Sequence, residues 1–434
     1  MWLFFLNLAF GHPQYELGVQ ALRQKEYSKA ETYLTKCTKD EPQNIACHWE
    51  LGWVYWMKSD WSKVVKNWKI VQKLDPKHPE INTYLPQAVD NEKLLTLMEQ
   101  DKKEAPKSFD IRQDSSLRIR AVGDMMIGTT FPRGYLPQNE GKGAFKRVKS
   151  LLKDADLTFG NLEGPLCDTG KSSKCKNSKN CYAFRSPTAY KDIYKDAGFD
   201  LVSTANNHSN DFGRECLLKT EESLDEVGIY HSGRPGDIAY MQVNGLSIAM
   251  IAFHTSRSGH YINDHKTAKN LVKKLDETNN IVIVSFHGGA EGAKAIHLPK
   301  GRETFLGEDR GDLRKFSRDV IDSGADIVLG HGPHVLRGME VYKNKLIAYS
   351  LGNFATYGRF SLKGNKGIGV ILEANLNAKG DFLSGQLFAT KQIGRGVPVE
   401  DSSGKAIDLI RKLSLDDFDG TGVRVAQDGT IQKP

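Results

Sequence analysis

The residues best suited to chemistry stand in short polar stretches, and each stretch follows an apolar run. They are Gly123-Asp124, Asn161 with Glu163, Asn206-Asn207-His208, His287, and His331 with His334. Carboxylate and amide oxygens and imidazole nitrogens are the ligands that Mn²⁺, Fe or Zn²⁺ take in proteins. These residue types therefore predict a catalytic metal centre that holds one or two divalent ions.

Each stretch, taken alone, also has an ordinary structural explanation. Gly-Asp after a strand is common turn chemistry, Asn-Asn-His can cap a helix, and a single buried His is most often a packed core residue. Five stretches of this kind are harder to explain separately than together. The six cysteines include no Cys-x-x-Cys pair, which argues against a purely structural zinc site.

The apolar runs are typical of strands in an α/β domain that begins near Leu117. The predicted strands are 117–122, 156–159, 199–204, 247–253, 281–286, 326–329, 335–342 and 346–349. Helical patterns near 144–152, 187–196, 214–227 and 313–323 separate several of them. Alternation of this kind predicts a largely parallel sheet covered on both faces, and such sheets bind ligands beyond the carboxyl ends of their strands.

The polar stretches extend into longer motifs that occur in a fixed order. They are Gly123-Asp-Met-Met-Ile-Gly128, Gly160-Asn-Leu-Glu-Gly-Pro-Leu166, Ala205-Asn-Asn-His208, His287-Gly-Gly-Ala-Glu291, Gly324-Ala-Asp-Ile-Val-Leu-Gly-His-Gly-Pro-His334 and Ala348-Tyr-Ser-Leu-Gly-Asn-Phe354. Over residues 117–360 this series resembles the bacterial capsule-synthesis CapA family, which is associated with poly-γ-glutamate production. The resemblance implies a calcineurin-like metallophosphoesterase fold, a sheet sandwich flanked by helices.

The resemblance also implies roles for particular residues. The implied metal ligands are Asp124, Glu163, Asn207, His287, His331 and His334. His208 would act on the leaving group, oriented by Asp211 or Glu163, and the substrate-binding candidates are Asn161, Arg185 and Glu291. An exposed arginine before a helix is an equally good explanation of Arg185.

Two positions depart from the metallophosphoesterase pattern. Met126 stands where a histidine usually follows the first aspartate, and Asn161 stands near the place of the bridging carboxylate. A neutral amide bridges two cations poorly, so Glu163 is the candidate for that role. The number of ions, one or two, therefore stays open.

The resemblance implies a metal-dependent hydrolase or transferase that acts on an anionic polymer or phosphoester in the cell envelope. The alternative is a non-catalytic binding component of an envelope assembly. Met126 favours the alternative, whereas retention of the whole ligand set favours the enzyme.

The first hundred residues repeat with a period of 34. Gly18 corresponds to Gly52, Tyr27 to Trp61, and Pro42 to Pro76. The period and residue types resemble tetratricopeptide repeats, with residues 81–98 as a capping helix. Such repeats bind protein partners, so an exposed aromatic face is one prediction; the alternative is that the tryptophans build the core. The predicted domains are repeats over 12–100, a linker over 101–116, the CapA-like domain over 117–400 and a tail over 401–434.

The composition of the chain bears on its binding partners. Charged residues make up 26% and the net charge is +7, without a block that indicates nucleic acid binding. The lysine-rich loop 171–179 is predicted to be either a solvated loop or a surface for an anionic polymer.

Residues 1–11 are typical of a secretory signal without its basic leader. We therefore expect export to the periplasm or envelope, or a cytoplasmic protein if this segment is not a signal. No apolar run is long enough for a transmembrane helix, and Cys175 could pair with Cys181.

Overall fold

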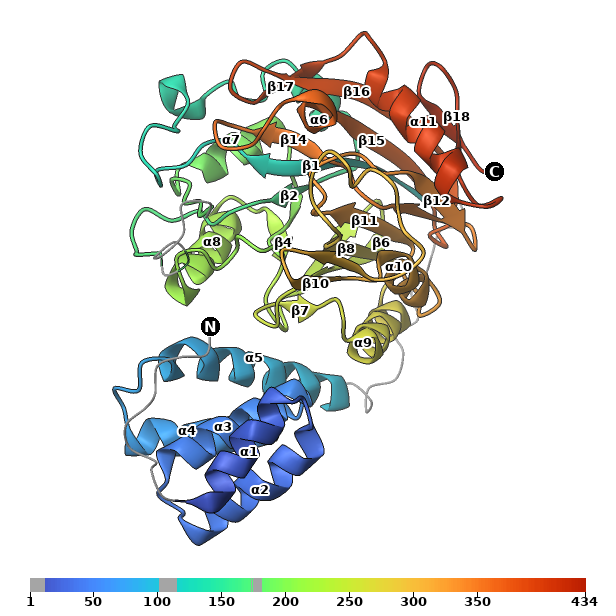
Figure 1. Ribbon diagram of the computed structural model, residues 1–434. Helices are drawn as coiled ribbons and strands as arrows, with labels where there is room; N and C mark the ends of the chain where they lie inside the picture. Colours follow the sequence, from blue (N-terminus) through green and yellow to red (C-terminus); the bar gives the residue numbers. More distant parts are fainter. Residues whose placement is uncertain (1–11, 101–114, 173, 175–181) are drawn as a thin grey trace. The chain divides into compact units, whose positions relative to one another are not determined.

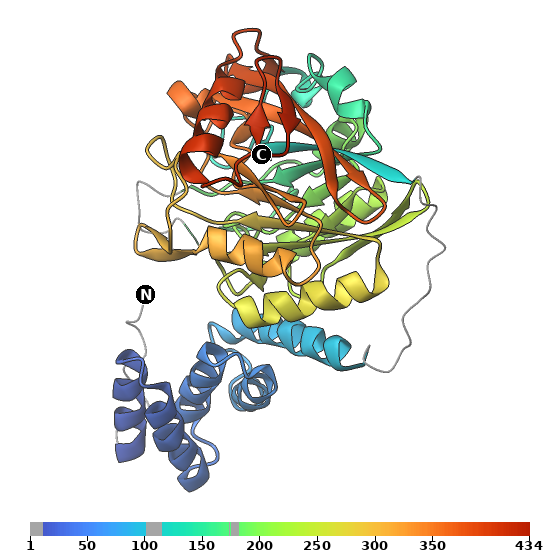
Figure 2. The same ribbon diagram turned by 90° about the vertical axis from the view of Figure 1, so that its right-hand side faces the viewer.

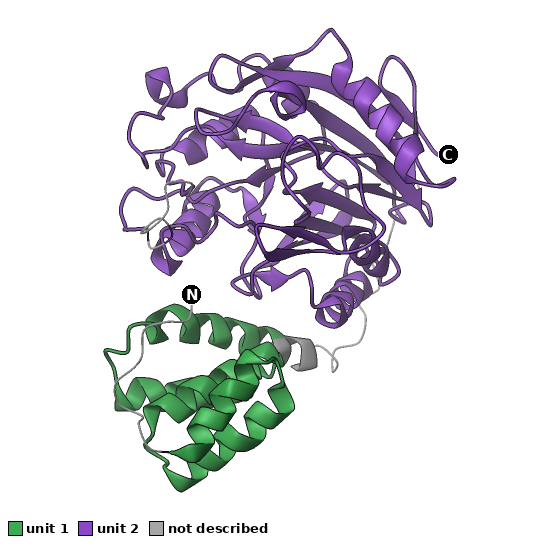
Figure 3. Cartoon of the chain, viewed as in Figure 1, with its two compact units in different colours: residues 1–103 green, residues 104–434 purple. Residues whose placement is uncertain are grey.

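A computed structural model of the chain describes residues 12–100, 115–172, 174 and 182–434. The chain divides into two compact units, residues 1–103 and 104–434 (Figure 3). The expected signal segment, nearly all of the expected linker and most of the lysine-rich loop lie outside the described residues. Cys175 and Cys181 lie there too, so their pairing stays a prediction.

The first unit consists of helices that follow the 34-residue period. They are α1 (Pro13–Arg23), α2 (Tyr27–Asp40), α3 (Ile45–Met57), α4 (Trp61–Leu74) and α5 (Ile81–Gln100). Helix α4 begins and ends 34 residues after α2. A Cβ on Gly18 would lie 2.5 Å from the Leu34 side chain, and one on Gly52 would lie 2.0 Å from Trp68. The repeated glycine therefore permits the close approach of the paired helices.

The tryptophans of this unit pack against one another. Trp49 stacks on Trp68 with ring centroids 5.0 Å apart, and Trp56 packs edge-on against Trp61 at 5.0 Å. All four are buried, and Trp53 is half-buried. Among the described residues of this unit no aromatic side chain is exposed. The predicted exposed aromatic face is therefore wrong, because these rings form the interior between the helices.

The second unit is built on two β-sheets (Figure 1). The larger sheet contains β1 (Ser116–Met126), β2 (Leu157–Leu162), β3 (Leu201–Ser203), β4 (Tyr230–Ser232), β14 (Asn353–Thr356), β15 (Ile368–Asn377), β16 (Phe382–Ile393), β17 (Val397–Glu400), β18 (Arg424–Val425) and β19 (Thr430–Gln432). Strands β1 to β4 and β14 run parallel, whereas β15, β16 and the strands beyond them pair antiparallel. The carboxyl ends of β1, β2 and β3 therefore share one edge.

The smaller sheet has a parallel centre with an antiparallel strand at each side. It contains β5 (Ala239–Val243), β6 (Leu246–His254), β7 (His260–Tyr261), β8 (Ile281–His287), β11 (Ile327–His331), β12 (Met339–Tyr342) and β13 (Lys345–Ala348). A separate hairpin is formed by β9 (Glu303–Phe305) and β10 (Glu308–Gly311). Parallel pairing of β6, β8, β11 and β13 aligns their carboxyl ends.

Apolar side chains of the two sheets meet in a shared core, and helices cover their other faces (Figures 1 and 2). Side chains of α6 (Lys149–Lys153), α7 (Tyr190–Ala197) and α8 (Arg214–Glu226) pack on the larger sheet. Helices α9 (His265–Thr278) and α10 (Leu313–Ile321) pack beside β8 and β11. This architecture confirms the predicted α/β sheet sandwich preceded by an all-α unit. No helix in the described parts of the chain is long and apolar enough to cross a bilayer.

The C-terminal part differs from the prediction. The expected tail from residue 401 forms α11 (Lys405–Asp417), β18 and β19, and β19 pairs with β16. Ile407 and Ile410 on α11 enter the core between the sheets. The segment belongs to the domain because it buries these side chains. Helix α9 and the antiparallel strands β15 to β19 were also absent from the prediction.

Candidate metal centre

Polar residues end the core-facing rows of three parallel strands. In β11, Ile327 and Leu329 face the core between the sheets, and the next position with the same parity is His331. In the same way Leu157 and Phe159 lead to Asn161 in β2, and the inward row of β8 ends on His287. Because side chains alternate along a strand, these residues project into one end of the inter-sheet space. Apolar packing thus delivers polar side chains to a single buried place.

Strand β1 reaches the same place through a register shift. Ile119 and Ala121 face the inter-sheet core, whereas Val122 and Met125 pack on the opposite face. Pairing with β2 shifts register between Ala121 and Asp124, and the shift turns Asp124 inward. Gly123 lies within it, where a Cβ would come 2.0 Å from the carbonyl oxygen of Gly352. The glycine is needed because the neighbouring chain passes so close.

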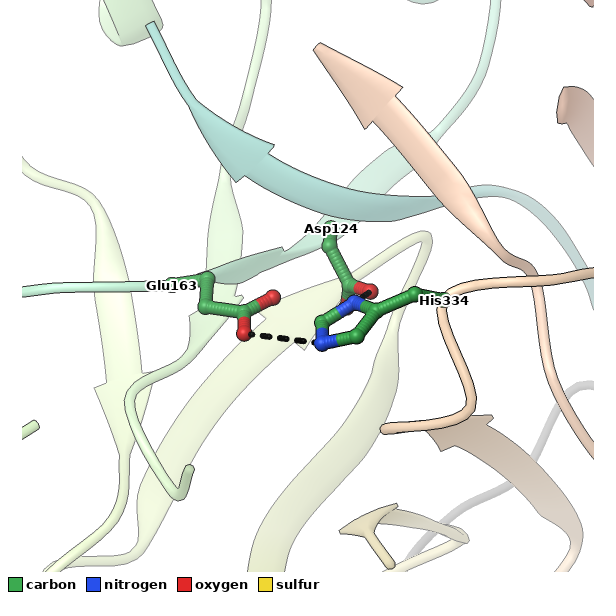
Figure 4. Close-up of side chains that lie close together, drawn as sticks. All are labelled: Asp124, Glu163 and His334. Atoms are coloured by element: carbon green, nitrogen blue, oxygen red, sulfur yellow. Dashed lines mark hydrogen bonds and ion pairs between the residues drawn. The ribbon is translucent and has the colours of Figure 1, made fainter. Parts of the chain in front are cut away.

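Asp124, Glu163 and His334 meet at the centre of the site (Figure 4). Each offers one ligand atom, and these atoms lie within 4.8 Å of one another. Nδ1 of His334 lies 2.9 Å from Oδ2 of Asp124, and its Nε2 lies 3.6 Å from Oε1 of Glu163. His334 adopts the left-handed conformation, with φ of 58°. This uncommon backbone aims the ring at both carboxylates.

The electrostatics of these three residues fit a cation. Burial raises the pKa of Glu163 well above its usual range, and the neighbouring Asp124 raises it further. Although burial opposes it, His331 and His334 hold the pKa of Asp124 well below its usual range. Burial would lower the pKa of His334, but Glu163 and Asp124 raise it to about 10. Without an ion, protons must balance the buried carboxylates, so a divalent cation could replace them.

Further buried ligand atoms in this region lack hydrogen-bond partners. Both ring nitrogens of His287 and His331, both carboxylate oxygens of Glu163, and Oδ1 of Asn207 are buried without one. His331 Nδ1 lies 3.4 Å from Asp124 Oδ1 but forms no hydrogen bond with it. Buried polar atoms are nearly always satisfied in folded proteins. Their types and their shared location fit a metal site.

His208 and Asp211 form a hydrogen-bonded pair beside Glu163. Nδ1 of His208 donates to Oδ2 of Asp211 at 2.7 Å, and His208 Nε2 lies 3.9 Å from Glu163 Oε1. Lys174 donates to the other oxygen of Asp211 at 2.7 Å. Burial lowers the pKa of His208; Lys174 acts in the same direction and Asp211 opposes it. Asp211 therefore holds the ring with Nε2 directed towards the carboxylate centre.

Asparagines form a layer behind the ligand atoms. Nδ2 of Asn161 donates to Asp124 at 2.8 Å, and its Oδ1 accepts from Asn206 at 3.2 Å. Asn161, a predicted substrate-binding residue, is fully buried, and its amide hydrogen bond helps to orient Asp124. Asn353 accepts from Nδ1 of His334 at 3.1 Å. Asn206 and Asn353 were not among the predicted site residues, although both stand in the motifs of this region.

The remaining predicted residues lie around this centre in different ways. Glu291 Oε2 is 3.9 Å from Nε2 of His334, and Arg310, fully buried, donates to Glu291 Oε1 at 2.9 Å. Arg185 donates to Thr130 and to the Gly170 carbonyl and stacks on Phe212, so it lies at the margin. Met126 is buried. Sequence reasoning missed Arg310, which carries no motif signal.

Comparisons with known proteins agree with these motifs. A family model described as "Bacterial capsule synthesis protein PGA_cap" matches residues 118–357. The "Capsule biosynthesis protein CapA" of Bacillus anthracis is 30% identical over 263 residues, which cover 56% of this chain and 60% of that protein. The "PGA biosynthesis protein CapA" of Bacillus subtilis is 30% identical over 282 residues, which cover 60% of this chain and 68% of that protein.

The chain spans 60% of the length of the Bacillus anthracis relative. Among solved structures, the match to a proposed 5′-nucleotidase of Staphylococcus aureus covers 69% of this chain and 58% of the nucleotidase chain. The sequence identity is 14% and the TM-score is 0.37. A likeness at that score is too weak to bear on fold or function.

Proposed function

Because the chain belongs to the bacterial capsule synthesis protein PGA_cap family, we propose that it is a metal-dependent hydrolase or transferase. Its substrate would be an anionic polymer or phosphoester in capsule biogenesis, such as poly-γ-glutamate. Two relatives named for capsule and PGA biosynthesis support the setting. The side chains between the two sheets support the chemistry.

The observation that carries the proposal is the state of Glu163. Its side chain is fully buried, both carboxylate oxygens lack hydrogen-bond partners, and Asp124 and His334 lie beside it. A buried carboxylate that accepts no hydrogen bond is costly, and a coordinated metal ion would offset that cost. A hydrophobic core with only a structural role would not require such a carboxylate.

The ligand set we propose is Asp124, Glu163, Asn207, His287, His331 and His334. A divalent ion held there, such as Mn²⁺, Fe or Zn²⁺, would acidify a water molecule and polarise the bond to be cleaved. His208 would take or deliver the proton at Nε2, because Asp211 accepts from Nδ1 and fixes the tautomer. Asn161 and Asn353 hold Asp124 and His334 in orientation.

Metal content is the direct test. The full chain would be reconstituted with Mn²⁺, desalted and analysed for metal, beside the double variant His287→Ala/His334→Ala. The matched control is His265→Ala/His297→Ala, since these histidines pair with Asp319 and Asp417 and are not among the proposed ligands. We expect one or two equivalents in the wild type and in the control, and none in the site variant. Equal, sub-stoichiometric metal in all three proteins would overturn the proposal.

A second candidate is a non-catalytic binding component of an envelope assembly. Met126 favours it, because this buried thioether stands where metallophosphoesterases carry a ligand. The repeat unit would then recruit a protein partner. A metal-loaded protein without turnover on anionic oligomers and phosphodiesters would support this candidate. Export to the cell envelope is part of both proposals, and detection in the periplasmic or surface fraction tests it.

A further inference from the structure

Three arginines near the proposed metal centre stack on aromatic rings. Arg359 lies 5.0 Å from the ring centroids of both Tyr135 and Tyr182. Arg395 lies 5.3 Å from the same Tyr135 ring and 5.2 Å from that of Tyr357. Arg185, in the segment that contains Tyr182, lies 4.9 Å from the Phe212 ring. We call Arg185, Arg359 and Arg395 the arginine rim.

The rim is joined to the centre by two phenylalanines. Phe360, next to Arg359, lies 5.3 Å from the His334 ring and 5.2 Å from Phe184. Phe184, next to Arg185, lies 4.4 Å from the His208 ring. Arg359 and Arg185 are thus each adjacent in sequence to a phenylalanine whose ring contacts a histidine of the site. The rim therefore lies where a substrate would extend beyond the reacting group.

The rim arginines lack carboxylate partners. Within the described part of the chain none of the three guanidinium groups forms an ion pair, and Nε of Arg359 is buried without a hydrogen-bond partner. By contrast, Arg120, Arg310 and Arg337 each pair with a glutamate. Positive charge at the rim is therefore not neutralised by the protein itself.

The rim guanidinium groups keep part of their hydrogen-bonding capacity. Arg185 donates to Thr130 and the Gly170 carbonyl, and Arg395 donates to the Gly134 carbonyl, whereas the Arg359 guanidinium donates to no group among the described residues. N–H groups without protein partners can bind a carboxylate through two hydrogen bonds. The surrounding segment adds charge of the same sign. Residues 357–368 include Arg359, Lys363 and Lys366 and no acidic residue. The Lys366 carbonyl accepts from Asn353, so this segment runs beside the centre.

We propose that the arginine rim is a subsite for the carboxylates of a polymer of acidic residues, next to those at the reaction centre. This inference rests on the proposed function and adds the residues that select a polyanion. A ligand with a single anionic group would occupy the metal centre alone. A chain with repeating carboxylates would fill both places. Arg359 and Arg395 lie beyond the region matched by the family model.

Binding of a labelled, short γ-linked glutamate oligomer tests the inference. Fluorescence anisotropy on the metal-reconstituted full chain would compare the wild type with Arg359→Gln/Arg395→Gln. The matched control is Lys405→Gln/Arg424→Gln, which removes the same charge from exposed positions on α11 and β18. We expect the rim variant to bind at least about tenfold more weakly and with a shallower salt dependence. Arg359→Lys should bind the oligomer with intermediate affinity, because lysine keeps the positive charge but cannot form two parallel hydrogen bonds to one carboxylate.

The outcomes separate this inference from the proposed function. Equal binding by the rim variant and the wild type, or no binding by the wild type, overturns the subsite whatever the metal content is. Polyphosphate that binds more tightly than the glutamate oligomer overturns the assignment to carboxylates. Loss of binding in the rim variant supports the subsite even if the protein holds no metal, in which case the proposed hydrolase fails alone. Metal content should be the same in all variants.

Discussion

His334 Nε2 lies 3.6 Å from Glu163 Oε1, and the two residues come from opposite sheets of the sandwich. Glu163 follows β2 of the larger sheet, and His334 follows β11 of the smaller one. The proposed centre therefore exists only when both sheets are packed together. A perturbation of sheet packing should therefore also disturb the centre.

Replacement of Glu163 by Gln should have opposite effects with and without metal. In chelator the variant should be more stable by about 1–3 kcal/mol near neutral pH, because a buried carboxylate without hydrogen bonds is removed. With Mn²⁺ the wild type should gain stability and the variant should not. Thermal unfolding followed by circular dichroism in both conditions measures this. A variant less stable than the wild type in chelator would contradict the interpretation.

Replacement of His208 by Gln should reduce turnover by about 10²–10⁴-fold and leave metal content unchanged. The reason is that Nε2 of His208 faces Glu163, while its Nδ1 is committed to Asp211. Initial rates on bis(p-nitrophenyl) phosphate and on a γ-linked glutamate oligomer provide the measurement. His297→Gln is the control, since that ring is exposed and pairs with Asp417. Loss of metal along with activity would assign His208 a ligand role instead.

Replacement of Gly123 by Ala should displace Asp124. The new Cβ would lie 2.0 Å from the Gly352 carbonyl oxygen, so the register shift in β1 must change. We expect a loss of about 1–3 kcal/mol in the free energy of unfolding, together with loss of bound metal. Gly52→Ala is the matched control, because its Cβ would meet Trp68 at 2.0 Å in the other unit. That variant should lose stability and keep its metal.

Removal of the Cys37–Cys47 disulfide should destabilise the repeat unit. The bond joins α2 to α3. Cys37→Ser/Cys47→Ser should lower the free energy of unfolding of this unit by about 2–3 kcal/mol. All six tryptophans lie in residues 1–103, so tryptophan fluorescence in the full chain reports on this unit alone. Cys167→Ser/Cys216→Ser, which removes the disulfide of the other unit, should leave the fluorescence transition unchanged.

The stability of the repeat unit should also depend on the ionisation of Glu50. Burial raises its pKa from 4.5 to about 7, and Arg23 only partly opposes this. The folded unit then holds a proton that the unfolded chain releases, so stability should fall as pH rises from 4.5 to about 7 and level off above that. The total change is up to about 3 kcal/mol. Glu50→Gln should abolish it in urea titrations followed by tryptophan fluorescence; an unchanged slope would show that other groups cause it.

Local sequence patterns predicted much of this architecture. The 34-residue period places α2 and α4 in register, because equivalent glycines and apolar residues must pack in the same way in each repeat. Strands β6, β8 and β11 were predicted within two residues at most of their ends, since each is a continuous apolar run. The antiparallel strands β15 to β19 were missed, because exposed and half-buried positions interrupt the buried ones along β15 and β16 and leave a weak local signal.

The sequence by itself determined the types of the proposed ligands and their position at strand ends. It also determined the family motifs that carry them. The tertiary structure decided which of these side chains meet. Asp124 turns inward because β1 shifts register where Gly123 meets the Gly352 carbonyl, and the Asn161 amide donates to Asp124. The physical reason is that side-chain direction in a strand depends on parity and on bulges. These are set by pairing with segments far away in the chain, which no local pattern encodes.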